Sequence, residues 1–144
     1  MLRSSRRLLR RDAKVDLISK VPLFAVCSKK ELATIANRAD QIEWPEGKTV
    51  IREGSSGSEF LLLIEGTMSV SRGGTKLREL EAGEWAGEIA LIANVPRTAT
   101  VVTTSPVRAL VLTRGGFLDL IEDNPPIAAK VLASLGERVA PETI

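Results

Sequence analysis

The sequence has no histidine, no tyrosine and only one cysteine among its 144 residues. Because no imidazole is present, Ser/His/Asp and Cys/His relays and histidine-containing zinc sites cannot form, which excludes most hydrolase classes. The single cysteine, Cys27, can form neither an internal disulfide nor a cysteine-rich metal site, and this usage is common in reducing compartments. We therefore expect a cytoplasmic protein without a bound metal.

Aromatic residues and long apolar runs are also scarce. Aromatic side chains make up 3% of the chain, which disfavours proteins that bind single-stranded nucleic acid by stacking aromatic side chains on the bases. No segment approaches the ~20 consecutive apolar residues of a membrane span, and the start lacks the apolar stretch of a secretory signal. The length and the 44% hydrophobic content suit one soluble domain with an aliphatic core.

The net charge of +2 hides an uneven distribution. Residues 1–14 hold six basic groups and one acidic group, a balance of +5, which leaves −3 on the remainder. We interpret residues 1–16 as a basic N-terminal arm or helix and residues 17–144 as the folded domain. The arm could contact an acidic surface of lipid or nucleic acid, although a solvated helix or a frayed end is the commoner outcome.

The N-terminal part of the chain carries helical signals. Ser28 followed by Glu31 forms a capping-box pattern before apolar residues at helical spacing, which predicts a helix over 29–38. A weaker apolar pattern predicts another helix over 5–19, which Pro22 ends.

The C-terminal part returns to helical patterns. Gly115-Gly116 precedes a short helix that stops at Pro125-Pro126. A last helix follows, its apolar residues share one face, and it ends near Pro141.

Between these helices, short aliphatic and β-branched runs alternate with glycine-rich turns, which is typical of antiparallel strands. Glu65-Gly66 and Arg72-Gly73-Gly74 predict hairpins, and Pro45-Glu46-Gly47 predicts a turn. The fold class that follows is α+β, mainly β: an antiparallel, jelly-roll-like β-roll flanked by N-terminal and C-terminal helices. The expected strands are 41–44, 48–52, 59–65, 67–72, 75–80, 99–104 and 107–113.

The segment AGEWAGEIALIANVPRTATV, residues 82–101, departs from the strand pattern. It predicts a short helix over 87–92, opened by Gly87, whose amides suit an anion. Arg97 could aim a planar guanidinium at the same anion, and Glu88 could accept a hydrogen bond from a hydroxyl. A ligand with a phosphate next to a sugar hydroxyl would satisfy both groups, and nucleotides have this combination. A structural salt bridge between Glu88 and Arg97, with no ligand, accounts for the same spacing equally well.

These residues resemble the cyclic nucleotide-binding domain family, found in bacterial catabolite activator protein, regulatory subunits of cAMP-dependent kinase and cyclic nucleotide-gated channels. The phosphate-binding cassette of that family is similar to GEIAL at 87–91 and PRTATV at 96–101. The segments VPLFAVCSKKEL and EGKTVIREGSSGSEFLLLIEGTMSV resemble the helical entry and the barrel of the family. The similarity extends from about Leu17 to Val139.

The resemblance implies roles for individual residues. Glu88 would bind the ribose 2′-OH, and Arg97 would bind the exocyclic phosphate oxygens. Backbone amides around Ile89, Ala90 and Ala99 would complete the cradle. The full set of expected ligand-binding residues is Gly87, Glu88, Ile89, Ala90, Arg97, Thr98 and Ala99.

Three departures from the family pattern bear on affinity and specificity. Ala86 stands where the family commonly has a large aromatic residue, with Trp85 one place earlier. The Thr98 hydroxyl follows the arginine, but it does not decide between adenine and guanine. The last helix, which covers the base in the family, is short, and its candidate lid residues are Leu135, Arg138 and Val139.

The resemblance implies a sensor that binds a cyclic nucleotide, cAMP in preference to cGMP, and signals through movement of its flanking helices. No catalysis and no cofactor are expected, and a cupin-like enzyme would usually need histidine ligands. The alternative is a non-binding β-roll that acts as an interaction or assembly module. An effector domain or a second copy could bind the flanking helices. A DNA-binding helix-turn-helix would have to follow Val139, so we expect none within this chain.

Overall fold

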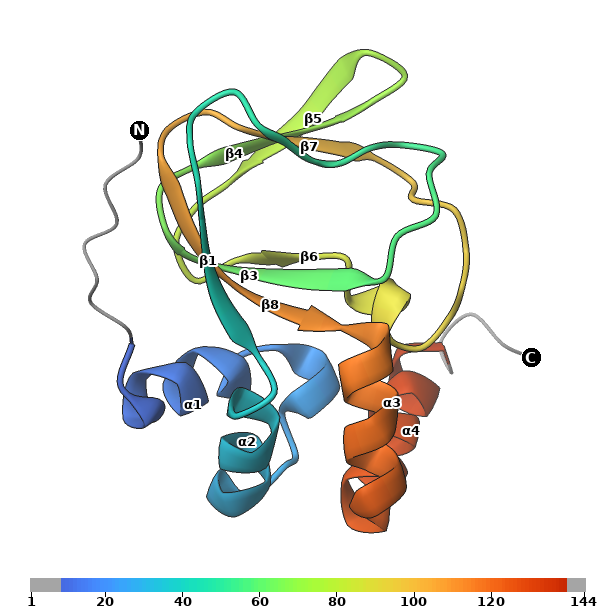
Figure 1. Cartoon of the computed structure of the whole chain (residues 1–144). Helices are drawn as coiled ribbons and strands as arrows, with labels where there is room; N and C mark the ends of the chain where they lie inside the picture. The colour runs from blue at the N-terminus through green and yellow to red at the C-terminus, as the bar shows by residue number, and fades with distance from the viewer. Residues whose placement is uncertain (1–8, 140–144) are drawn as a thin grey trace.

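The computed structural model describes residues 9–139, which form two antiparallel sheets and flanking helices (Figure 1). The elements, in chain order, are α1 (Arg11–Ser19), η1 (Pro22–Phe24), α2 (Lys29–Ala36), β1 (Asp40–Trp44), β2 (Thr49–Ile51), β3 (Glu59–Glu65), β4 (Met68–Arg72), β5 (Thr75–Leu80), β6 (Trp85–Ala86), η2 (Glu88–Leu91), β7 (Thr100–Thr103), β8 (Val107–Thr113), α3 (Arg114–Asp123) and α4 (Pro125–Val139). Both η elements are 3₁₀ helices. No helix in this described part is long and apolar enough to cross a membrane.

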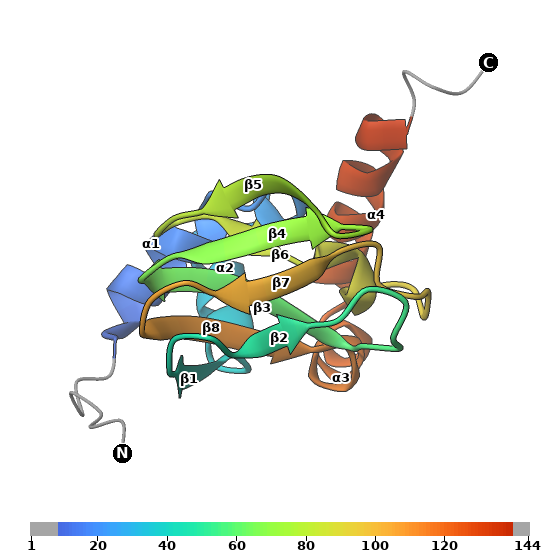
Figure 2. The ribbon, with the colours of Figure 1, turned by 90° about the horizontal axis from the view of Figure 1, so that it is seen from above.

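The strands form two four-stranded sheets that face each other. One sheet has the order β1-β8-β3-β6, and the other has the order β2-β7-β4-β5. All the pairings are antiparallel, and β8 connects β1 to β3 in the first sheet. Figure 2 shows the second sheet lying over the first, with α4 projecting beyond the edge of the roll. The predicted β-roll with helices at both ends is therefore confirmed.

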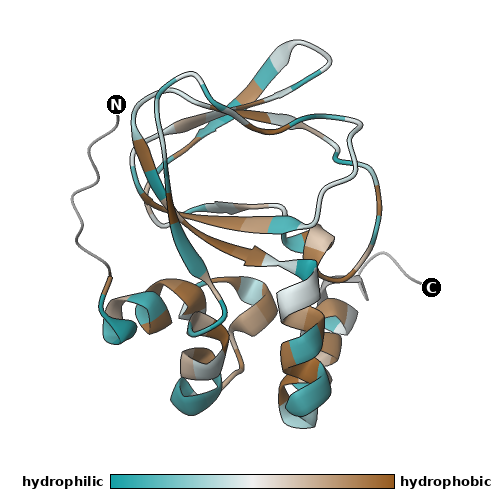
Figure 3. Ribbon diagram, in the orientation of Figure 1, coloured by the Kyte–Doolittle hydropathy of each residue, from teal (hydrophilic) through white to brown (hydrophobic). Residues whose placement is uncertain are grey.

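The helices cover the outer face of the first sheet and form one hydrophobic cluster with it (Figure 3). The three phenylalanines belong to this helix-side cluster, and Phe24 contacts the rings of Phe60 and Phe117 with centroid separations of 6.4 and 5.9 Å. Full burial of a side chain of this size contributes roughly 1.5–3 kcal/mol. The cluster therefore fixes both helical ends of the chain onto one sheet.

A second hydrophobic cluster fills the interior of the roll, between the two sheets. Strand β3 contributes to both clusters, because Phe60 and Leu62 face the helices while Leu61 and Leu63 face the interior. This double burial explains the unbroken apolar run FLLLI in β3, where a strand with one solvated face would alternate.

Helix boundaries differ from the predicted ones for identifiable reasons. The first helix begins at Arg11, since Leu9 and Arg10 are not helical and the Leu9 N–H donates to Gln41 Oε1 at 2.8 Å. Residues 5–8 of that predicted helix lie outside the described residues. The predicted division between residues 16 and 17 falls inside α1 and stays a prediction.

The capping box before α2 is confirmed. The Glu31 N–H donates to Ser28 Oγ at 3.1 Å, and the Ser28 N–H donates to Glu31 Oε1 at 2.8 Å. The helix itself ends at Ala36, two residues earlier than predicted. At the other end of the chain, α3 starts at Arg114 and so includes the glycine pair, because Thr113 Oγ1 accepts from Gly116 N–H and caps the helix.

One predicted hairpin is wrong. The strands on either side of Glu65-Gly66 do not pair, since β3 belongs to the first sheet and β4 to the second. Gly66 has a φ of 98° and turns the chain from one sheet to the other, at a point where a Cβ atom would collide with the Pro106 carbonyl oxygen. The hairpin at Arg72-Gly73-Gly74 does join the paired strands β4 and β5, as predicted.

Candidate functional site

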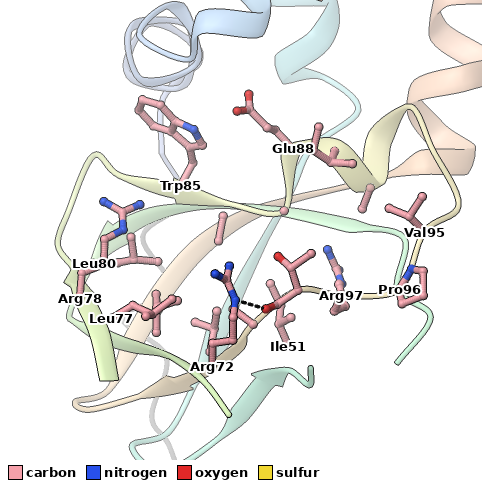
Figure 4. A pocket seen from close by; sticks show the side chains of 18 residues that line it. Ile51, Arg72, Leu77, Arg78, Leu80, Trp85, Glu88, Val95, Pro96 and Arg97 are labelled. Atoms are coloured by element: carbon pink, nitrogen blue, oxygen red, sulfur yellow. Dashed lines mark hydrogen bonds between the residues drawn. The ribbon is translucent and has the colours of Figure 1, made fainter. Parts of the chain in front are cut away.

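A pocket of about 410 Å³ opens between the segment 85–99 and the β4–β5 hairpin (Figure 4). This volume lies within the usual range for small-molecule sites. All seven residues predicted from the sequence line it: Gly87, Glu88, Ile89, Ala90, Arg97, Thr98 and Ala99. We call residues 87–99 the cassette.

Gly87 turns the chain from β6 into η2. Its φ of 82° lies in the left-handed region, which disfavours other residues. A Cβ atom at this position would also lie 2.7 Å from the Glu59 carbonyl oxygen and 2.8 Å from Arg97 Nη1. Glycine is therefore required here both for the turn and for the space that the guanidinium of Arg97 occupies. Glu88 follows as the first residue of η2, borders the pocket and is half-buried. Figure 4 shows its carboxylate on the same side as the Trp85 ring, directed away from Arg72 and Arg97.

Arg97 is held tightly at the pocket wall. Its side chain is 7% exposed, Nη2 donates to the Glu59 carbonyl oxygen at 2.7 Å, and the Glu59 carboxylate lies 3.5 Å from the same nitrogen. Burial lowers the pKa of Arg97 from its ordinary value, and the nearby charge of Glu59 opposes that shift. Gly57 leaves room for the guanidinium, because a Cβ atom there would lie 2.8 Å from Nη2. A fixed cation therefore forms part of the pocket wall.

The remaining cassette residues differ in what their backbone groups do. The Ala90 N–H donates to the Gly87 carbonyl oxygen at 3.0 Å, so in this structure that amide closes the η2 turn. The carbonyl oxygen of Thr98 accepts from Arg72 Nε at 2.8 Å. Ile89 has an exposed side chain beside the pocket, and Ala99 forms part of its wall.

The wall of the pocket opposite the cassette is not predicted by the sequence patterns. Arg72 and Arg78 come from the β4–β5 hairpin, and Leu77 and Leu80 lie on β5 beside them. The signal that could have found these residues is the confirmed hairpin, which brings both of its strands to one side of the roll.

Trp85 and Ala86 show why the displaced aromatic residue does not fill the pocket. In strand β6 successive side chains point to opposite faces. Trp85 packs against the helix-side cluster and Ala86 against the interior cluster, although both border the pocket. The side chain that faces the interior of the roll at position 86 is therefore only a methyl group.

Arg114 connects the cassette to the first residue of α3. Its Nη1 donates to the carbonyl oxygens of Ala90 and Ala93 at 3.2 and 3.1 Å, and its backbone N–H donates to the Ser58 carbonyl oxygen at 2.7 Å. One residue thus joins η2, the segment before β3 and helix α3.

Helix α4 does not cover the pocket. No described residue of α4 lines it, and Leu135, one of the predicted lid residues, packs against the helix-side cluster. The side chains of the other two, Arg138 and Val139, lie outside the described part of the chain.

The two facing sheets enclose an interior pocket, and the cassette forms one of its walls. The family model described as "Cyclic nucleotide-binding domain" matches residues 41–124, more than half of the chain. This chain belongs to the cyclic nucleotide-binding domain family.

Individual relatives agree with this family. The chain is 34% identical over 106 residues to a "cAMP-dependent protein kinase regulatory subunit" of Aspergillus niger, with 72% of this chain and 26% of that protein covered. The chain therefore spans about a quarter of the length of that relative.

Solved structures share the fold. The N-terminal domain of a transcriptional regulator from Streptomyces coelicolor A3(2) has a TM-score of 0.83 at 24% identity, with 89% of this chain and 95% of that chain covered. The cAMP-bound structure of PfPKA-R has a TM-score of 0.67 at 27% identity, with 88% of this chain and 47% of that chain covered.

Proposed function

We propose that this domain is a sensor that binds a cyclic nucleotide, cAMP in preference to cGMP, in the pocket beside the cassette. The observation that carries the proposal is the buried guanidinium of Arg97 at the wall of a pocket of about 410 Å³. Glu59 binds this guanidinium, and Gly57 and Gly87 leave the space that it occupies. A cyclic phosphate offers the anionic oxygens that such a planar donor recognises.

The other groups of the pocket suit the rest of the nucleotide. The Glu88 carboxylate takes the ribose 2′-OH. Leu77, Leu80 and Val70 offer an apolar wall for the base. The preference for cAMP is supported by the relative named as a cAMP-dependent kinase regulatory subunit and by the cAMP-bound structure. In this proposal the residues of the pocket bind the ligand and have no catalytic role.

In this proposal, ligand binding is communicated to other parts of the protein by movement of the flanking helices. Arg114 ties the cassette to α3, so a displacement of η2 on ligand binding changes the position of α3. Leu118 on α3 and Leu132 on α4 are large apolar side chains with exposed fractions of 45% and 68%. They offer a surface to an effector domain or to a second copy.

Calorimetric titration of the whole chain with cAMP and with cGMP tests the binding. We expect heat with both ligands and the tighter binding with cAMP. Arg97→Ala should weaken cAMP binding roughly ten- to one-hundred-fold, the worth of a charge-assisted hydrogen bond, and Glu88→Ala should also weaken it. Arg52→Ala is the matched control, since Arg52 is exposed and does not line the pocket.

Two results would contradict the proposal. The absence of heat with either nucleotide at millimolar concentration would reject the binding. That result, with an intact fold, would favour the alternative of a non-binding interaction module. The small side chain of Ala86 points the same way, as does the finding that no described residue of α4 lines the pocket. Unaltered affinity in both pocket variants would reject the assigned site.

A further inference from the structure

The pocket holds three arginines, and they differ in how their charges are compensated. Arg97 lies 3.5 Å from a carboxylate oxygen of Glu59, and Arg78 lies 3.5 Å from one of Glu84. Arg72 forms no ion pair within residues 9–139, while its two counterparts are paired. Since a paired guanidinium presents little net charge to an incoming anion, the uncompensated charge on this wall is that of Arg72.

Arg72 is also held in a defined place. It is the last residue of β4, next to Ser71, which lies opposite Thr100 in the sheet register. Its Nε donates to the Thr98 carbonyl oxygen at 2.8 Å, and Thr98 directly follows Arg97 in the chain. Figure 4 shows the Arg72 side chain in the pocket with this bond drawn. The bond uses Nε, so Nη1 and Nη2 are the donors that face a ligand beside the cassette.

We propose that Arg72 is a second anion-binding residue of this site, one that contacts the phosphate of the bound nucleotide together with Arg97. The inference rests on the proposed function and deepens it. Arg97 supplies a buried, preformed fork whose charge Glu59 already offsets, while Arg72 supplies the net positive charge that attracts the anion. The bond to Thr98 O places the second guanidinium at the cassette.

Two other roles for Arg72 give different expectations. If Arg72 acted only by holding the cassette through its Nε bond to Thr98, which we call a structural brace, every variant without this nitrogen would lose the same cAMP affinity. A solvated surface cation would leave affinity unchanged when removed. The charge role alone predicts that lysine, which keeps the charge and loses the Nε bond, retains most of the affinity.

The experiment is calorimetric titration of cAMP into the wild-type chain and into Arg72→Gln, Arg72→Lys and Arg52→Gln, each at low and at high NaCl. Arg52→Gln is the matched control, because it removes the same charge from an exposed residue that does not line the pocket. Thermal melts of all four chains verify that each is folded under the titration conditions.

We expect Arg72→Gln to weaken cAMP binding about tenfold at low salt, with a smaller loss at high salt because ions screen an exposed charge. The cAMP affinity of Arg72→Lys should stay within about threefold of the wild-type affinity, and the affinity of Arg52→Gln should equal that of the wild type. Wild-type affinity in Arg72→Gln overturns the inference. So does a lysine variant as weak as the glutamine variant, which indicates a brace. Both outcomes leave the proposed function standing, whereas a wild-type chain that binds no cyclic nucleotide overturns the two proposals together.

Discussion

The two faces of strand β3 border very different interiors. On the helix side, 18 buried side chains form one cluster, which contains all three phenylalanines and nearly all the buried side chains of the helices. On the roll side, eight buried residues form the second cluster, and three of them, Ile51, Leu80 and Val101, also form part of the wall of the pocket. Apolar packing is thus concentrated on one side of the sheet, and space for a ligand is kept on the other.

The charged groups follow the same division. Guanidinium groups border the pocket at Arg72 on β4, at Arg78 on β5 and at Arg97, which lies in the cassette before β7. The helix-side cluster consists only of apolar side chains and Cys27, whose pKa burial raises. A substitution on the helix side should therefore act on stability, and a substitution at the cassette should act on binding.

The largest expected effect lies in the helix-side cluster. Phe117 is fully buried against Phe24, so Phe117→Ala should lower the free energy of unfolding by about 3–5 kcal/mol. Leu118→Ala, at the exposed neighbouring position, should change it by less than about 0.5 kcal/mol. Urea unfolding of both variants measures the difference. Equal losses would show that this side of the sheet is not the stabilising one.

The next effect tests the cassette side. Gly87→Ala should cost roughly 1–2 kcal/mol of stability through its left-handed backbone and should displace the Arg97 guanidinium, so that cAMP binds more weakly. Gly83→Ala is the matched control, because Gly83 has a similar φ of 91° but no atom within 4 Å of an added Cβ. Melting and calorimetry together separate strain from displacement. The same cAMP affinity in the two variants would contradict the role given to Gly87.

A smaller effect is expected at the entry to α2. Ser28→Ala removes the side-chain cap and should lower stability by about 1 kcal/mol, with no change in the cAMP affinity of the folded chain. Lys29→Ala, in the same turn, serves as the control and should be close to neutral. A change in nucleotide affinity without a change in stability would break the division between the two faces.

The smallest effect is a pH dependence at Glu31. Hydrogen bonds from Lys130 and from the Ser28 N–H lower the pKa of Glu31 below its ordinary value. The contribution of this carboxylate to stability is therefore present above the ordinary pKa and is lost as pH falls through the lowered one. In unfolding measurements from neutral to acidic pH, the advantage of the wild type over Glu31→Gln should disappear at the acidic end. A constant advantage would rule out this linkage.

Local signals predicted much of this molecule. Periodicity, turn residues and the capping box placed most of the strands and the helix α2, because these features depend on neighbours in the chain. The Glu65-Gly66 hairpin failed because the identity of the partner strand depends on the sheet to which each strand belongs. The two-residue strand β6 is too short to give a periodic signal.

The candidate site divides in the same way. The cassette residues were predicted because they are contiguous in the sequence and match a specific motif. Arg72, Arg78 and Glu59 reach the pocket or its arginine from other strands, and only the packing of the two sheets brings them together. The position of Arg97 also depends on Gly57, because a Cβ atom at that residue would collide with the guanidinium.

The side chain of Arg114 has a consequence for how the molecule opens. It holds the carbonyl oxygens of Ala90 and Ala93, at the C-terminal end of η2, from the first residue of α3. A four-residue 3₁₀ turn alone would exchange its amide hydrogens rapidly, because short helices fray. With Arg114 in place, the turn and the start of α3 are expected to open as one unit, so deuterium should enter both segments at a common rate.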